Sequence, residues 1–260
     1  MTAIELPSRP TRTPGLLAAA SQVALRALRK FLRTPGLSVM GVVQSAMFLF
    51  SFRYVFGGAI HAGATSYVDF LVPAYVASIV LFTGGGIAVA VATDKAEGFT
   101  DRLLSLPVSR YALVLGRVLA DSATNIWAIA STAAFGFLFG FRLPGSWPDG
   151  LAALGLCAAY AVVFTVVFLV MGLYAPSAQA AQGMSLIAFV FAFISSAYVP
   201  ATSMPGWLQP FAKYQPITPM VDAVRALLTG STSDVGLALA WSALLVVVLG
   251  PVAVIRYRRA

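Results

Sequence analysis

Long apolar runs separated by short polar segments occupy most of this chain. The hydrocarbon core of a bilayer is about 30 Å thick, so a helix needs about 20 mostly apolar residues to cross it. Six runs approach or exceed that length: 37–56, 70–93, 111–141, 151–174, 184–199 and 235–255. The pattern predicts an all-α polytopic membrane protein with six transmembrane helices, forming one transmembrane domain over residues 35–260.

The fourth and fifth runs lie in a stretch without charge. Residues 150–212 contain no Asp, Glu, Lys or Arg. Ala175-Pro176-Ser177 supplies turn-forming residues between these two runs. We therefore expect the chain to turn there between two helices.

The N-terminal segment has a different character. Residues 1–14 are polar and rich in proline, and we expect them to be a disordered tail. Over 15–34 apolar residues recur at helical spacing while Arg and Lys gather on another face, which predicts an amphipathic helix lying in the membrane interface. A signal peptide is excluded, because the basic part is too long and no small-residue cleavage site follows the first apolar run.

The segment 200–234 is apolar but interrupted by four prolines, at positions 205, 210, 216 and 219. Trp207, Leu208 and Phe211 could form the apolar face of one short helix, and Met220, Val224, Leu227 and Leu228 that of a second, ending at Gly230. We expect two short re-entrant helices here, since non-spanning backbone at membrane depth needs protein or water to satisfy it.

The largest polar interruption between spans is 94–110, with the sequence DKAEGFTDRLLSLPVSR. Asp94 and Glu97 have the spacing of a capping box. Phe99, Leu103 and Leu106 place an apolar stripe on a short helix that ends before Pro107. A solvated loop and an amphipathic helix that docks into a partner protein both fit this pattern.

Composition excludes several classes of protein. The chain is 59% hydrophobic, and its mean hydropathy is +0.87. The net charge of +8 comes from residues at membrane boundaries and not from a basic domain, so we expect no nucleic-acid partner. Cys157 lies alone in an apolar run and His61 in a predicted loop, which leaves no disulfide and no metal site. No phosphate-binding loop and no catalytic triad occurs, so the chain is not expected to be an enzyme.

The basic residues also predict orientation, because cytoplasmic loops are enriched in Lys and Arg. With the N-terminus inside, the three inner segments hold 13 of the 17 basic residues. The four on the other side are Arg53, Arg142, Lys213 and Arg225. Both termini and the 94–110 segment are therefore expected to be cytoplasmic.

Polar residues also occur within the spans. Arg117, Asp121 and Asn125 follow at i+4 steps and share a helix face. A structural ion pair between Arg117 and Asp121 and a role in a substrate or ion path are both open. Thr83-Gly84-Gly85-Gly86 lacks the Lys of a phosphate loop, and close helix packing accounts for it better.

The six-span layout, the basic interfacial helix and two motifs resemble the ABC-2 type permease family, and within it the daunorubicin-resistance permeases. The motifs are EGFTDRLLSLPVSR at 97–110 and MPGWLQPFAKYQPITPMVDAVRALLTG at 204–230. The resemblance covers the chain from about residue 15 onward.

The resemblance implies specific roles for these segments. The loop between the second and third spans would be a coupling helix that inserts into a separate ATPase subunit, and 200–234 would roof the translocation path. The coupling residues carried over are Glu97, Gly98, Phe99, Asp101, Arg102, Leu103, Pro107 and Arg110. Phe99 departs from the family, many of whose members carry threonine there. The turn over 174–183 would be a second, minor contact.

The function implied is the membrane subunit of an ATP-driven exporter in the bacterial cell membrane. The chain itself would hold no cofactor, with ATP and magnesium bound by the partner ATPase, and a second permease protomer would complete the path. Walls with few charges favour a hydrophobic or amphipathic cargo such as a drug, a polyketide or a lipid. An ion-gradient-driven secondary transporter using Asp121 is the alternative, and a membrane scaffold without transport is a third.

Overall fold

A computed structural model describes residues 35–56, 66–98 and 110–257, together with Ser21, Gln22, Leu25, Arg29 and Arg33. All the regular structure in these residues is helical. The elements are α2 Pro35–Ser51, a π-helical turn Phe52–Phe56, α3 Tyr67–Ala96, α5 Arg110–Leu138, α6 Trp147–Tyr174, α7 Ala178–Phe193, a 3-10 turn Ala201–Ser203, α8 Gln209–Tyr214, α9 Ile217–Leu228 and α10 Val235–Tyr257. The predicted tail at 1–14 and most of the predicted interfacial helix at 15–34 lie outside the described residues.

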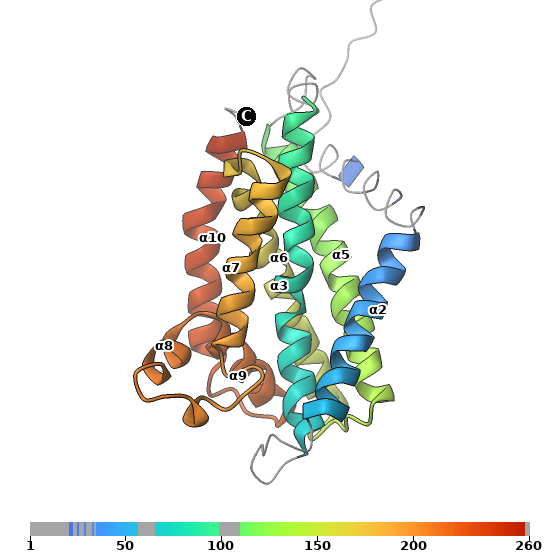
Figure 1. Ribbon diagram of the computed structural model, residues 1–260, viewed down its shortest axis with the longest axis vertical. Helices are drawn as coiled ribbons and strands as arrows, with labels where there is room; N and C mark the ends of the chain where they lie inside the picture. The colour runs from blue at the N-terminus through green and yellow to red at the C-terminus, as the bar shows by residue number, and fades with distance from the viewer. Residues whose placement is uncertain are drawn as a thin grey trace, which may run out of the picture.

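The long helices stand side by side in one bundle, with α3 in its middle (Figure 1). The chain ends at one end of this bundle, which we call the C-terminal end. The short helices α8 and α9 lie across the opposite end, which we call the α9 end (Figure 1). Helix α3 is buried along most of its length, and both α5 and α6 pack against it.

Four of the described helices are long and apolar enough to cross a membrane: α3, α5, α6 and α10. Helix α7 is apolar but has only 16 residues, and α2 has 17. The all-α membrane class predicted from the pattern is confirmed. The count of six spans stays a prediction, since α2 and α7 fall short of spanning length on their own.

Both predicted ends of the fifth long helix are wrong. The fifth apolar run was expected to form a helix over 184–199, but α7 covers Ala178–Phe193 and the chain turns from Ile194 onward. The start is set by Ser177, whose Oγ accepts the Ala180 N–H at 3.1 Å as a helix N-cap. Hydropathy misplaced both ends, because Gln179 and Gln182 interrupt the apolar pattern within the first turns of α7, and residues 194–199 continue it beyond the end of the helix. The turn predicted at Ala175-Pro176-Ser177 is confirmed.

The segment 200–234, which we call the roof segment, is also helical. Of its two short helices, only the second agrees well with the prediction. Helix α9 buries Met220, Val224 and Leu228 and is followed by Gly230, whose φ of +74° is the left-handed conformation of a helix C-terminus. Helix α8 is shorter than predicted, because Trp207 and Leu208 lie in the turn before it.

Helices α3 and α6 approach closely where glycine replaces a side chain. A Cβ on Gly84 would lie 2.0 Å from the ring of Phe168, and a Cβ on Gly172 would lie 2.5 Å from the Ala88 carbonyl oxygen. Small residues let helix backbones approach in membranes, where packing replaces the hydrophobic effect as the driving force. The interpretation of the Thr83–Gly86 run as a packing motif is confirmed at Gly84.

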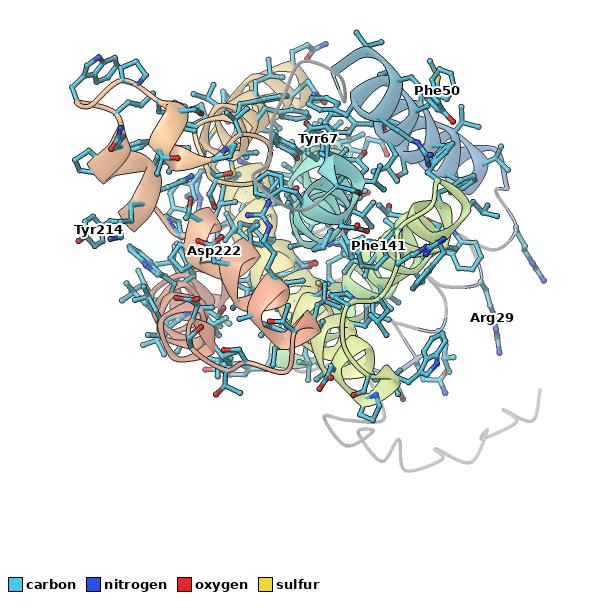
Figure 2. All side chains as sticks on the ribbon, turned by 90° about the horizontal axis from the view of Figure 1, so that it is seen from below. Arg29, Phe50, Tyr67, Phe141, Tyr214 and Asp222 are labelled. Carbon is cyan, nitrogen blue, oxygen red and sulfur yellow. The ribbon has the colours of Figure 1, made fainter. Side chains whose placement is uncertain are left out.

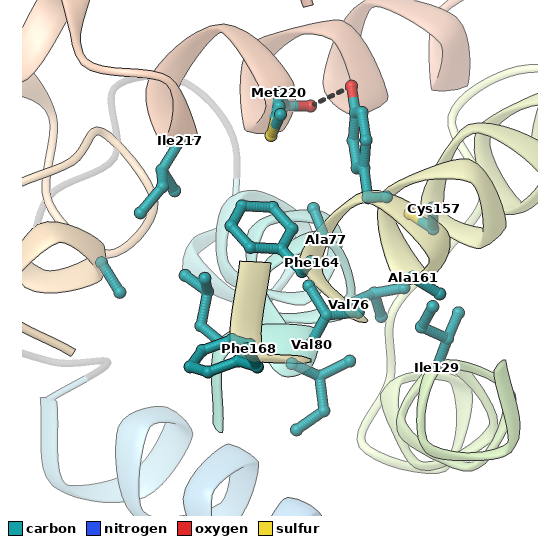
Figure 3. Close-up of a cluster of buried hydrophobic side chains, with 14 of the residues drawn as sticks. Val76, Ala77, Val80, Ile129, Cys157, Ala161, Phe164, Phe168, Ile217 and Met220 are labelled. Carbon is teal, nitrogen blue, oxygen red and sulfur yellow. Dashed lines mark hydrogen bonds between the residues drawn. The ribbon is translucent and has the colours of Figure 1, made fainter. Parts of the chain in front are cut away.

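The buried core joins this pair to α5 and α9. Val76, Ala77 and Val80 of α3 lie near Phe164 and Phe168 of α6, with Ile217 and Met220 of α9 above them (Figure 3). Tyr160 of α6 is fully buried and donates its hydroxyl to the Met220 carbonyl at 3.3 Å, the dashed bond in Figure 3. The roof is therefore attached to the core and not laid loosely over it.

We expect Gly84→Ala to destabilise the bundle and Gly86→Ala to leave it intact. The added methyl at position 84 meets Phe168, and overpacking of this kind costs about 1–3 kcal/mol. At Gly86 nothing lies within 4 Å of the new Cβ, so the variant gains only helix propensity. Unfolding midpoints in detergent measure both. Equal midpoints for the two variants would contradict the close approach of α3 and α6.

Candidate functional site

The predicted coupling segment joins the end of α3 to the start of α5. Glu97 and Gly98 follow α3 directly, and Arg110 is the first residue of α5. The Glu97 N–H donates to carbonyls of the last turn, and Gly98 has a φ of +65°, which ends the helix. The other predicted coupling residues lie outside the described residues: Phe99, Asp101, Arg102, Leu103 and Pro107.

The predicted capping box at the start of this segment is wrong. Asp94 lies in the last turn of α3, and Glu97 is the C-cap of that helix, so neither residue begins a helix. The apolar pattern of α3 ends at Thr93, but the helix continues for about one more turn, until Gly98 permits the backbone to reverse. The carboxylate of Asp94 is consequently free to face α5.

Asp94 takes part in a cluster of three charged side chains. The Arg117 guanidinium of α5 donates Nη1–H to Asp94 Oδ2 and Nε–H to Asp121 Oδ2, the latter at 2.7 Å. The side chains of Arg117, Asp94 and Asp121 are 23%, 32% and 18% exposed. The spacing of Arg117 and Asp121 predicts that they pair. The structure shows that Asp94 is a second partner of Arg117.

This cluster binds together the two helices that flank the coupling segment. Two carboxylates share one cation, so the cluster carries a net negative charge, and at these exposures water screens it only in part. Because Asp94 belongs to α3 and Arg117 to α5, the ion pair holds the last turn of one helix against the second turn of the other.

Deeper in the bundle, Asn125 continues the same face of α5. It is fully buried and accepts a hydrogen bond from Thr83 Oγ1 at 2.6 Å, while its Nδ2 donates to Thr165 Oγ1 at 3.0 Å. Ser122 and the Ala161 carbonyl complete the partners of Thr165. Polar side chains from α3, α5 and α6 thus satisfy one another within the apolar interior, which supports a rigid three-helix contact.

The ends of α6 and α10 also lie at the C-terminal end of the bundle, close to the end of α3. Lys95 Nζ donates to the Leu173 carbonyl at 3.3 Å, which ties the end of α3 to the end of α6. The Arg256 guanidinium of α10 lies 5.0 Å from the ring centroid of Tyr174. The α6–α7 turn, predicted as a minor contact, therefore lies against the end of α3 that leads into the coupling segment.

The α9 end has a polar centre of its own, built around Arg225. Its guanidinium donates to the carbonyls of Phe70, Ser196 and Ala197, each at 3.0 Å, and lies 3.8 Å from the Phe70 ring centroid. Ser196 and Ala197 follow the end of α7, where carbonyls have no intrahelical partner. Asp222, labelled on α9 in Figure 2, accepts from both Arg225 and Ser196.

The cation in this centre persists at neutral pH. Burial lowers the pKa of the Arg225 guanidinium to about 10, although Asp222 opposes that change. Arg225 therefore remains a cation and can serve three carbonyls. Burial also raises the pKa of the Asp222 carboxyl above its ordinary value, against the opposing effect of Arg225. Close by, Tyr198 Oη lies 2.8 Å from Ser78 Oγ in a buried hydrogen bond between the segment after α7 and α3.

Sequence reasoning missed Arg225 and Asp94 for different reasons. Arg225 was counted only as a basic residue on the outer side, although a single cation within the apolar stripe of a short helix is a signal for a buried role. Asp94 was assigned to a helix start because its spacing to Glu97 was right. Its pairing depends on the antiparallel arrangement of α3 and α5, which no local pattern contains.

These features define a class of protein. A bundle of long apolar helices, with a charged cluster at one end and short helices across the other, is typical of a multi-pass α-helical membrane protein. Among the described residues no group of three His, Cys, Asp or Glu side chains could hold a metal ion.

The sequence comparison defines the family within that class. The profile of the ABC-2 type transporter family matches residues 19–229, so the chain belongs to that family. It is 29% identical over 260 residues to the daunorubicin resistance ABC transporter permease protein DrrB1 of Streptomyces coeruleorubidus, covering 99% of this chain and 92% of the relative. It is 26% identical to a probable doxorubicin resistance ABC transporter permease protein, DrrC, of Mycobacterium tuberculosis, covering 100% and 98%. These full-length relatives are permeases of ABC transporters, which favours that function over the ion-driven alternative.

We expect the charged cluster to stabilise the C-terminal end without carrying a transported ion. Asp94→Asn and Asp121→Asn should each lower the free energy of unfolding by about 1–2 kcal/mol, since each weakens one partly desolvated pair. Arg117→Gln should cost more, because two carboxylates then face each other without a cation. Chemical unfolding in detergent measures this, with the exposed Asp234→Asn as a control expected to stay within about 0.5 kcal/mol. Complete loss of transport in a well-folded Asp121→Asn protein would instead favour the ion-driven mechanism.

We expect Arg225 to hold the roof in place. Arg225→Gln should destabilise the α9 end by about 2–3 kcal/mol, because buried carbonyls lose a charged donor. Arg225→Lys should recover only part of this, since an ammonium lacks the planar fork that reaches several carbonyls. Hydrogen exchange over 194–216 reports the loosening, and Lys213→Gln on exposed α8 is the matched control. Unchanged exchange in Arg225→Gln would show that the contacts of Arg225 do not hold the roof.

Proposed function

We propose that this chain is the membrane subunit of an ATP-driven exporter for a hydrophobic or amphipathic compound. The observation that carries the proposal is the match of nearly the whole chain to drug-resistance ABC transporter permeases. Those relatives are named for resistance to daunorubicin and doxorubicin, and a drug of that kind is the cargo proposed here. We propose export as the direction of transport, because the same relatives are named for drug resistance.

The partner ATPase docks on the segment between α3 and α5. ATP and magnesium bind to that partner, and its motion is transmitted through Glu97, Gly98, Phe99, Asp101, Arg102, Leu103, Pro107 and Arg110. The proposal is supported by the position of the Asp94–Arg117 ion pair, which joins the two helices at the root of this segment. A push on the segment then moves the ends of α3 and α5 as one unit. The polar contacts of Asn125 lie along the same face, about two turns further in.

The α6–α7 turn provides a second contact for the ATPase over 174–183. Support comes from the bond between Lys95 and the Leu173 carbonyl, which places this turn beside the end of α3. Movement of the coupling segment would therefore also reach α6 and α7.

In the membrane, the chain makes six crossings with both termini in the cytoplasm. Helices α2 and α7 supply the two crossings in addition to α3, α5, α6 and α10, with the π-helical turn after α2 and the turn after α7 extending their reach. The asymmetry of basic residues supports this orientation in a bacterial cell membrane. A second permease protomer completes the path, and α8 and α9 roof it from outside.

Pull-down of the partner ATPase in detergent tests the docking segment. Glu97→Ala, Phe99→Ala and Arg102→Ala should each weaken binding, with the aromatic and arginine anchors costing about 2 kcal/mol, or roughly thirtyfold in affinity. Asp234→Ala, Trp207→Ala and Lys213→Ala make matched changes at the α9 end and should bind normally. If all three variants of the segment bind and transport like the unmodified chain, the segment is only a connection.

Single cysteines test the orientation in intact cells. Ser66→Cys and Ser231→Cys lie in exposed positions at the α9 end and should react with a membrane-impermeant maleimide from outside. Ser105→Cys in the coupling segment should react only after the membrane is opened. The native Cys157 is buried and serves as the background control. Labelling of Ser105→Cys from outside would reverse the proposed topology.

A further inference from the structure

A narrow apolar hollow lies near the α9 end between α3, α5 and α6. Its volume is about 90 Å³, and the surface exposed inside it is apolar. Val72 and Val76 of α3 and Cys157 of α6 form its inner wall, while Val224 of α9 closes one side. Phe137, Leu151 and Leu154, which stand at its outer edge, are 46%, 68% and 38% exposed. The hollow therefore opens sideways, toward the surface that faces lipid in a bilayer.

Gly150 helps to keep the hollow open. It lies in the second turn of α6, and a Cβ there would already come within 3.2 Å of Leu143 Cδ1. A larger side chain at this position would fill the space between α6 and the loop before it. Because no polar surface is exposed inside the hollow, water would gain no hydrogen bond there, and an apolar occupant is favoured.

A second, open hollow adjoins the first, and the cationic side chain of Arg142 is part of its lining. The two share Phe137, Phe141, Leu143 and Trp147, and the second adds Arg142 and Ser146. Arg142 is exposed and enters none of the ion pairs found among the described residues. Its backbone N–H donates to Asp69 Oδ1 at 3.2 Å, which fixes the loop that carries it. Trp147 is 74% exposed at the rim, as is typical of tryptophan at the headgroup level.

The acidic groups nearby leave Arg142 available. The carboxylate of Asp149 accepts the Ser146 N–H at 2.8 Å and the Ser146 hydroxyl at 2.6 Å, so it is engaged in capping α6. Asp69 receives a backbone N–H of the same loop. The guanidinium thus lines the open hollow that adjoins the apolar one, in the loop between α5 and α6.

We propose that these two hollows form a binding site for one phospholipid of the leaflet that borders the α9 end. The phosphate contacts the Arg142 guanidinium, the glycerol region lies beside Trp147, and one acyl chain passes Leu151 and Leu154 into the apolar hollow. Charge complementarity at the mouth and the wholly apolar interior together select this occupant.

Native mass spectrometry of the delipidated, full-length chain in detergent tests the site. Phosphatidylglycerol should bind as one retained molecule, and dioleoylglycerol, which has the chains without the phosphate, should bind at least tenfold more weakly. Arg142→Gln should weaken phosphatidylglycerol about tenfold, and Leu154→Trp, which fills the hollow from the lipid side, should abolish the retained molecule. Arg53→Gln removes the same charge at the same end outside both hollows, and it should bind like the unmodified chain.

Several outcomes would overturn the proposal. One is equal retention of phosphatidylglycerol by Arg142→Gln, Leu154→Trp and the unmodified chain at matched unfolding midpoints. Another is release of the lipid by daunorubicin, which would make the hollow a cargo site. A third is a dimer that Leu154→Trp dissociates without changing the lipid count, which would make the hollow a contact between two copies. Because none of these measurements involves ATP or the partner, they are independent of the proposed transport function.

Discussion

Backbone carbonyls cannot be left without partners where water is absent, and this constraint shapes both ends of the molecule. At the α9 end, the chain leaves the helical conformation after α7, and Arg225 supplies the donors that Ser196 and Ala197 then need. At the C-terminal end, Lys95 supplies a donor to the Leu173 carbonyl in the last turn of α6. In both places a cation from a distant part of the chain permits a helix to end within the bundle.

The middle of the bundle obeys a different rule, that of close packing. Helix α3 meets α6 where Gly84 accommodates Phe168, and it meets α5 through the ring of hydrogen bonds around Asn125. Under the proposed coupling to an ATPase, the rigid contact at the centre and the charged contacts near the ends would carry movement along the axis of the bundle. Force applied at one end is carried by packed helices and is not absorbed by loose ones.

The sequence was a good guide wherever a feature depended on local pattern. Apolar runs located every long helix, the spacing at Met220, Val224 and Leu228 located α9, and the turn at Ala175-Pro176-Ser177 was plain from its residues. It was a poor guide wherever two distant segments meet. The sequence predicts Asp94 as a helix cap, which is wrong. Its actual partner, Arg117, comes 23 residues later on an antiparallel helix and cannot be found from local spacing. The ends of α7 were missed because Ser177 acts through a single hydrogen bond, which mean hydropathy does not register. The coupling residues from Phe99 to Pro107 rest on family resemblance alone.

The roof has a consequence for the order in which the chain is built. Arg225 bonds to the carbonyl of Phe70, a residue 155 positions earlier, and to two carbonyls beyond α7. None of these acceptors is in position until α3 and α7 stand side by side, so the guanidinium must stay hydrated until then. Tyr160 likewise finds the Met220 carbonyl only once α9 has arrived. During synthesis, α9 would therefore stay at the membrane surface until α3, α6 and α7 are in place.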